Sequence, residues 1–219
     1  MIQPKLIYIF LRLIEVTRNY IKTLGLIKEL GAVLGIFVKE TKKSIDAEVE
    51  ELIKDEKVKG IWCVPKYSNP QGISYSDETV RRFARLKPAA PDFRIYWDNA
   101  YCIHHLYEDK QDQILNILEE CEKAGNPNMV YIFASTSKIS FPGSGVSAVA
   151  SSPENIKFIM SHMTVQTIGH DKINQLRHVR YFKDVDGIKA HMRKHAEFLR
   201  PKFDAVLDIF NTELAETGA

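Results

Sequence analysis

MVYIFASTSK, residues 129–138, is an apolar run that ends in a polar loop carrying a lysine. Such a short run of β-branched and aromatic residues, followed at once by small polar ones, is typical of a buried strand. The same scheme occurs twice upstream. KGIWCV at 59–64 precedes Asn69-Pro70-Gln71-Gly72, and FRIYW at 93–97 precedes Asp98-Asn99-Ala100-Tyr101. A fourth strand is expected at 145–150, after a glycine-rich turn.

Helical patterns separate these strands. Apolar spacing and capping signals predict helices at 44–54, 76–86, 112–124 and 153–163. Strands that alternate with helices predict an α/β fold with a mostly parallel sheet and helices on both faces.

Both ends of the chain differ from this pattern. Residues 1–43 form an atypical basic segment, with helical spacing at 6–16 and 24–38. A long helix is expected from Asp186 to about Glu216, and Pro201 should kink or split it. We therefore expect three parts: the basic segment at 1–43, a large domain at 44–185, and a connecting helix at 186–219.

Composition limits the classes of partner. Of the 219 residues, 45% are hydrophobic and 26% are charged, and the net charge is +2. This balance is that of a globular protein, and the charge is too small to predict nucleic acid or an anionic membrane as a partner. The apolar run at 6–11 is interrupted by Arg12 and Glu15, so no membrane span or leader is expected. Three scattered cysteines fit a reducing, cytoplasmic location.

The carboxyl ends of parallel strands lie at one edge of a sheet, which is where α/β proteins bind ligands. Each loop motif has an ordinary explanation when taken alone. Asn-Pro-x-Gly is a common turn, and an aspartate after a strand commonly caps a helix. Ser135-x-x-Lys138 also matches an acylation motif of penicillin-recognising enzymes, but its companion motifs Ser-Asp-Asn and Lys-Thr-Gly do not occur here.

The order and spacing of the three loops resemble those of the fold-type-I aminotransferases that depend on pyridoxal 5'-phosphate (PLP). VKGIWCVPKYSNPQG, FRIYWDNAYCIHHLYE, FASTSKISFPGSG and DKINQLRHVRYF are similar to the bacterial type Ic aspartate aminotransferases. The resemblance covers about residues 44–219. It implies amino transfer between an amino acid, aspartate above all, and a 2-oxo acid such as 2-oxoglutarate, by a homodimer.

The resemblance also implies roles for individual residues. Lys138 would form a Schiff base with PLP and then act as the catalytic base. Asp98 would pair with the pyridine nitrogen, and Asn69 and Tyr101 would hydrogen-bond the phenolic oxygen. Ser135 and Ser137 would donate hydroxyls to the phosphate.

Some family features are not found. The turn Phe141-Pro142-Gly143-Ser144-Gly145-Val146 lacks the arginine that clamps phosphate in many relatives. No phosphate loop is identified upstream, and no domain that supplies a carboxylate-binding arginine follows residue 186. We therefore expect a fragment-like chain that binds PLP weakly and transfers amino groups slowly.

Three alternatives remain. The chain could be an inactive or partial product that only binds PLP weakly, or a β-lyase or decarboxylase that uses the same residues. It could also resemble the aminotransferase-like domain of some transcription regulators, although residues 1–43 are too short for their DNA-binding domain.

His104-His105 suggests a metal, but neighbouring side chains point apart and no third ligand is suitably spaced. We interpret both as surface or supporting histidines.

Overall fold

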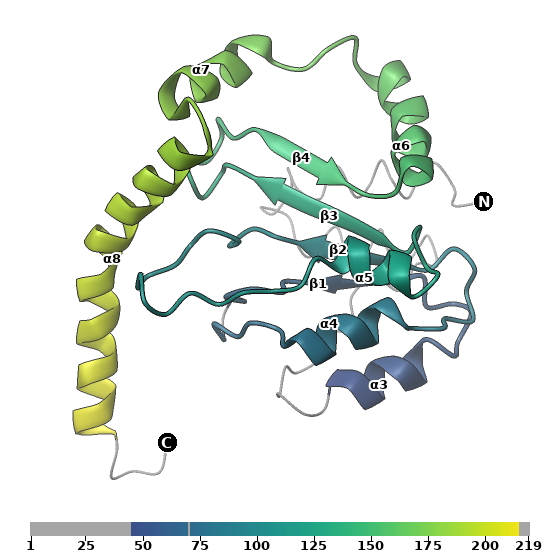
Figure 1. Cartoon of the computed structure of the whole chain (residues 1–219), viewed down its shortest axis with the longest axis horizontal. Coiled ribbons are helices and arrows are strands. Elements are labelled where there is room, and N and C mark those ends of the chain that lie inside the picture. Colours follow the sequence, from purple (N-terminus) through teal and green to yellow (C-terminus); the bar gives the residue numbers. More distant parts are fainter. Residues whose placement is uncertain (1–44, 70, 215–219) are drawn as a thin grey trace, which may run out of the picture. The chain divides into compact units, whose positions relative to one another are not determined.

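The computed structural model describes residues 45–69 and 71–214. Its elements, labelled in Figure 1, are α3 (Ile45–Leu52), β1 (Gly60–Cys63), α4 (Asp77–Ala84), β2 (Arg94–Asp98), α5 (Ile117–Lys123), β3 (Val130–Ser135), β4 (Ser147–Ala150), α6 (Pro153–Gln166), α7 (Lys172–Phe182) and α8 (Val185–Glu213). The helices expected at 6–16 and 24–38 lie outside the described residues.

The chain divides into two compact units that interleave along the sequence. The described parts of the first unit are 45–69, 71–99, 114–134 and 148–168; those of the second are 100–113, 135–147 and 169–214. The sequence predicts three parts, at 1–43, 44–185 and 186–219, and this division stays a prediction. Residues 1–43 are not described, and the two units are defined by their compactness and not as domains.

Within residues 45–69 and 71–214, the sheet has four strands in the order β1-β2-β3-β4. β1 pairs with β2 in parallel, with Cys63 opposite Trp97, and β2 pairs with β3 in parallel, with Asp98 opposite Phe133. Figure 1 shows the β4 arrow running opposite to that of β3. The prediction of an α/β fold with a mostly parallel sheet is confirmed.

The core of the first unit follows from two periodicities. In β2, Ile95 and Trp97 are buried and alternate with less buried neighbours, as a strand with one apolar face requires. In α4, Val80, Phe83 and Ala84 are buried at helical spacing. Figure 1 shows α4 and α5 side by side in front of the sheet, and the buried side chains of β2, α4 and α5 belong to one core cluster.

Several boundaries differ from the sequence-based expectations. The helix expected at 112–124 begins at Ile117, because the Asn116 side chain accepts a hydrogen bond from the Leu118 amide and caps the helix there. α7 was not expected, although Asp171 caps it in the same way through Asn174. α8 runs through Pro201 as one helix of 29 residues, so the proline does not split it.

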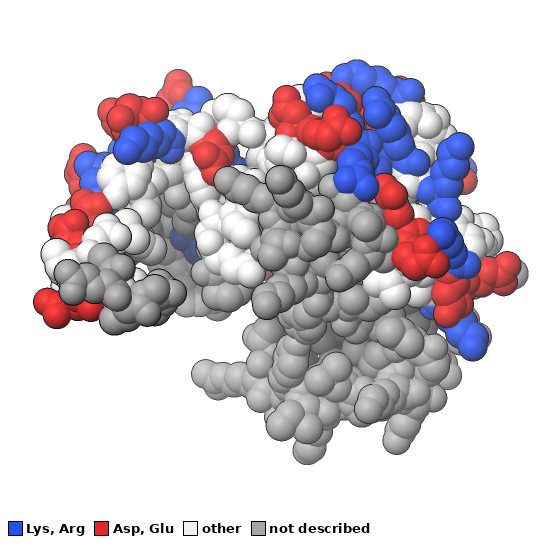
Figure 2. Space-filling model, turned by 90° about the horizontal axis from the view of Figure 1, so that it is seen from below, with Lys and Arg blue, Asp and Glu red and all other residues white. Residues whose placement is uncertain are grey.

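Charges of both signs occur on the described surface. Figure 2 shows lysine and arginine side chains interspersed with acidic ones on the face that it draws. Arg82 pairs with Glu50 at 2.8 Å, and Lys59 pairs with Asp92 at 2.7 Å. Of the helices in the described ranges, none is long and apolar enough to cross a membrane.

Candidate functional site

Lys138 lies on a closed loop directly after β3. The amide of Thr136, the residue after β3, donates to the carbonyl of Val146, the residue before β4, at 2.9 Å. This hydrogen bond closes residues 136–146 into a loop, which we call the lysine loop. The Lys138 side chain is exposed, and its Nζ lies 4.0 Å from the centroid of the Tyr101 ring. Among the described residues this amine has no hydrogen bond or ion pair. It is therefore accessible and rests on the π face of a tyrosine.

Two predicted phosphate-binding serines begin the same loop. The hydroxyls of Ser135 and Ser137 lie 2.6 Å apart, and the Ser137 amide donates to the Ser135 hydroxyl at 3.1 Å. Gly145 faces them from the other end of the loop. A Cβ at Gly145 would lie 2.7 Å from the Ser137 hydroxyl and 3.1 Å from its amide nitrogen. Glycine is needed here because the two ends of the loop approach so closely.

Three histidines hold the backbone and hydroxyls around Lys138. The Nε2 atom of His104 lies 3.1 Å from the Lys138 carbonyl oxygen, and that of His191 lies 2.8 Å from the next carbonyl, of Ile139. Because a carbonyl only accepts, both nitrogens donate.

In His104 and His191 the Nε2 atom donates a hydrogen bond, whereas in His178 it accepts one. Its Nδ1 donates to the Asn174 carbonyl at 2.9 Å, which leaves Nε2 to accept from the Thr136 hydroxyl at 3.0 Å. Asn174, one helical turn earlier on α7, donates to the Ser144 carbonyl at 2.8 Å. α7 therefore contacts the lysine loop near both of its ends, at Thr136 and at Ser144.

Asp98 and Asn69 belong to the first unit. Asp98 ends β2, is half-buried, and is followed by the Asn99 amide, which donates to the Phe133 carbonyl at 2.8 Å. Asn69 is exposed in a loop closed by the Tyr75 amide, which donates to the Pro65 carbonyl at 2.8 Å. Asn69 follows β1 as expected, whereas Asp98 is the last residue of β2 and does not lie in the loop after it.

The structure thus brings Tyr101 to Lys138 and Ser135 to Ser137, all within the second unit. The convergence of Asn69, Asp98, Tyr101 and Lys138 on one pocket stays a prediction. Sequence reasoning did not identify His178 and His191, and it treated His104 only as a surface or supporting residue.

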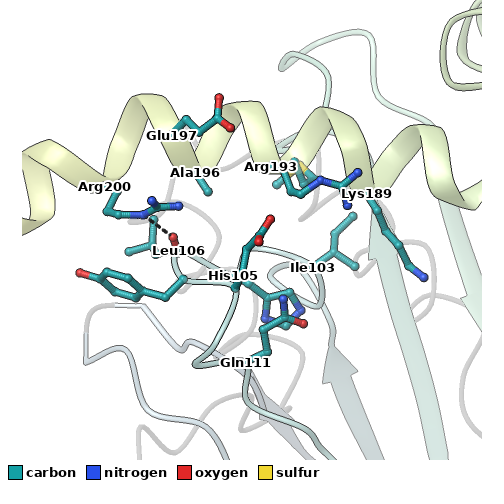
Figure 3. Close-up of a pocket in the computed structure, with 12 residues that line it drawn as sticks. Ile103, His105, Leu106, Gln111, Lys189, Arg193, Ala196, Glu197 and Arg200 are labelled. Carbon is teal, nitrogen blue, oxygen red and sulfur yellow. Dashed lines mark hydrogen bonds between the residues drawn. The ribbon is translucent and has the colours of Figure 1, made fainter.

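The described residues of the second unit also line two hollows. One, of about 430 Å³, lies between the loop at 103–111 and α8; Figure 3 shows His105 and Gln111 on the loop side and Arg193 and Lys189 on the helix side. Its dashed line joins Arg200 to the Leu106 carbonyl, at 2.8 Å.

The other hollow, of about 610 Å³, is lined in part by Arg177 and Arg180 of α7. The described residues contain no cluster of three metal-ligating side chains, and His104 and His105 have separate surroundings. These hollows identify no ligand by themselves.

We compared the chain with protein families and with known proteins. The model of a family described as aspartate amino-transferase matches residues 11–219. An aspartate aminotransferase of Corynebacterium glutamicum is 48% identical over 170 residues, which are 78% of this chain and 39% of that protein.

Solved structures agree. A crystal structure of an aspartate transaminase from Corynebacterium glutamicum has a TM-score of 0.82 at 42% identity, over 90% of this chain and 46% of that one. An α-aminoadipate aminotransferase of Thermus thermophilus, solved with N-(5'-phosphopyridoxyl)-L-leucine, has a TM-score of 0.61 at 20% identity, over 78% of this chain and 42% of that one. The second likeness concerns the fold alone.

The fold is therefore that of the α/β aminotransferases. Within this class, the chain belongs to the aspartate aminotransferase family. It spans about two fifths of the length of the curated relative described above.

Proposed function

We propose that the chain takes part in PLP-dependent amino transfer from an amino acid, aspartate above all, to a 2-oxo acid such as 2-oxoglutarate. Family membership supports the class of reaction. The single observation that carries the proposal is the exposed Lys138 amine, which rests 4.0 Å above the Tyr101 ring on a loop held by three histidines. The proposal includes a cytoplasmic homodimer, as the family resemblance implies.

The residues of the second unit fit PLP. Lys138 offers an amine without a competing hydrogen bond among the described residues. The hydroxyls of Ser135 and Ser137 share one hydrogen bond at 2.6 Å, so one hydroxyl hydrogen remains to donate to a phosphate oxygen. When bound, PLP supplies an aldehyde that links to amines and a ring that withdraws electrons.

Each predicted residue then has a task. Lys138 would hold the cofactor through its amine nitrogen, which replaces the aldehyde oxygen, lost as water; once released, the amine is suited to carry a proton of the substrate Cα. The Tyr101 ring orients that amine, because its π face attracts the ammonium form. Asp98 would hold the proton of the pyridine nitrogen, and Asn69 with the Tyr101 hydroxyl would bind the phenolic oxygen.

The test is a product assay with the full chain, PLP, aspartate and 2-oxoglutarate. Transfer moves one amino group, so oxaloacetate and glutamate should appear in equal amounts. The rate should be below the usual range of about 1–1,000 per second, because no arginine follows Pro142-Gly143 to clamp phosphate. Lys138→Ala should abolish both products, whereas Lys183→Ala, at an exposed lysine after α7, should not.

Other products would contradict the proposal. Alanine with carbon dioxide from aspartate would indicate a decarboxylase. Pyruvate with ammonia and hydrogen sulfide, formed when cysteine is supplied in place of aspartate, would indicate a β-lyase. Product formation that persists in Lys138→Ala would overturn the assignment of the lysine.

A further inference from the structure

His104 contacts both members of the lysine–tyrosine pair. Its Nε2 donates to the Lys138 carbonyl at 3.1 Å, across 34 residues of sequence. Its ring meets the Tyr101 ring edge to face, with centroids 5.4 Å apart and an angle of 77° between the planes. The Tyr101 ring in turn carries the Lys138 amine. One imidazole therefore touches the backbone of Lys138 and the surface on which its side chain rests.

The protonation state of His104 follows from its surroundings. Nδ1 is buried without a hydrogen-bond partner among the described residues, so a proton there would be an unsatisfied buried donor. Burial lowers the pKa of His104, the charges of Lys138 and His195 act in the same direction, and the bond to the Lys138 carbonyl opposes them. The ring is therefore neutral at neutral pH, with its hydrogen on Nε2.

The neighbouring histidines show what is particular to His104. His191 holds the Ile139 carbonyl, and His178 binds the Thr136 hydroxyl, so the loop has other attachments to α8 and α7. His104 comes from the tight turn that follows β2, where its own amide donates to the Tyr101 carbonyl at 3.1 Å. It ties this turn to the lysine loop.

We propose that His104 is a positioning residue for Lys138: its Nε2 fixes the Lys138 carbonyl while its ring fixes the Tyr101 ring beneath the lysine amine. This inference rests on the proposed function, because it concerns how the amine is presented to PLP. The inference gives a role to His104 and none to the adjacent His105, although the sequence does not distinguish the two histidines.

The experiment compares His104→Ala and His104→Gln with His105→Ala. The side-chain amide of glutamine can donate near the Nε2 position, but it provides no ring. His105 is the matched control because it is the adjacent histidine and faces the hollow of Figure 3. Two quantities are measured in each full-length variant: the dissociation constant for PLP, and the pKa of the Lys138–PLP linkage from the pH dependence of its visible absorbance.

We expect His104→Ala to weaken PLP binding about tenfold, equivalent to about 1.4 kcal/mol. The linkage pKa should rise by about half a unit or more, because water replaces the ring and better solvates the charged form. His104→Gln should recover part of the affinity but keep the raised pKa, and His105→Ala should match the wild type in both. If the alanine variant does not fold, the raised pKa in the glutamine variant carries the test.

Two failures can be told apart. If Lys138→Ala removes the linkage but both His104 variants keep the wild-type pKa and affinity, the positioning role is wrong and the proposed function stands. If the wild type forms no linkage that depends on Lys138, the proposed function fails, and the inference fails with it.

Discussion

Because the ring of His104 is neutral in the folded chain, we expect it to make the free energy of unfolding depend on pH. Burial lowers its pKa in the folded chain, against an ordinary value of about 6.5 when unfolded. Below about pH 6.5 the unfolded state therefore binds more protons than the folded state, and stability falls as the pH falls. His195, whose pKa burial also lowers, contributes in the same direction and is present in all variants below.

We predict that His104→Gln reduces this loss. The free energy of unfolding, from urea titrations at pH 7.5 and 5.5, should drop less between the two pH values in the variant than in the wild type. His170→Gln, at an exposed histidine, should behave like the wild type. An equal or larger drop in His104→Gln would show that its ring is not kept neutral by burial.

Single residues differ in how far the sequence predicted them. Lys138 and Tyr101 occur in loops of recognisable order and lie in contact, while the roles that the resemblance implies for them stay predictions. The contacts of His104 and His191 are to backbone carbonyls, which every residue possesses, so no sequence pattern marks them. His178 lies in a segment that resembles the family, but only the fold shows that it reaches Thr136.

At the scale of elements, the β3–β4 connection depends on the close approach of Gly145 to Ser137. We predict that Gly145→Ala weakens PLP binding about tenfold, because the new Cβ would contact the Ser137 backbone and displace the loop. Gly169→Ala is the control, since no atom of the described residues, its chain neighbours aside, lies within 4 Å of a Cβ there. A fluorescence titration with PLP measures both, and wild-type affinity in Gly145→Ala would contradict the packing described.

The strands were easier to predict than the helices. β1, β2 and β3 combine apolar runs with polar loops after them, and each lies within one residue of the strand expected at 59–64, 93–97 or 129–134. α7 was missed, although Asp171 is a capping residue and the spacing of Ile173, Leu176 and Val179 is helical; in the described chain these three apolar side chains are exposed. Its attachments to the lysine loop are polar, through Asn174 and His178, and periodicity does not report such contacts.

For the molecule as a whole, the two units differ in the size of their cores. In the described residues, the main cluster of the first unit contains sixteen buried apolar or aromatic side chains, among them Val80, Ile95 and Val130, whereas that of the second has three: Ile139, Phe182 and Met192. From Pro201 onward, α8 is exposed on nearly every side. Regions with few buried contacts open at lower cost.

We therefore predict a hierarchy in amide hydrogen exchange. Peptides that cover β2 and β3 should exchange slowest, and the part of α8 after Pro201 should exchange fastest among the described helices. Mass spectrometry after timed exchange in deuterated buffer measures this order. Protection after Pro201 equal to that of β2 would mean that this part of the helix is covered in solution.

The sequence also predicts a property that belongs to the whole site. Asn69 and Asp98 lie in one unit, and Tyr101, Ser135, Ser137 and Lys138 lie in the other. The order of the motifs favours their convergence because all follow parallel strands, and this stays a prediction. Lys138, Tyr101 and the three histidines around them all lie within the second unit.

The most direct test of the central claim is to find which lysine binds PLP. The full chain is incubated with PLP, reduced with borohydride, digested and analysed by mass spectrometry. We predict that the pyridoxyl label is on Lys138 and is lost in Lys138→Ala. A label that is confined to another lysine, or is equally frequent on exposed lysines such as Lys183, would contradict it.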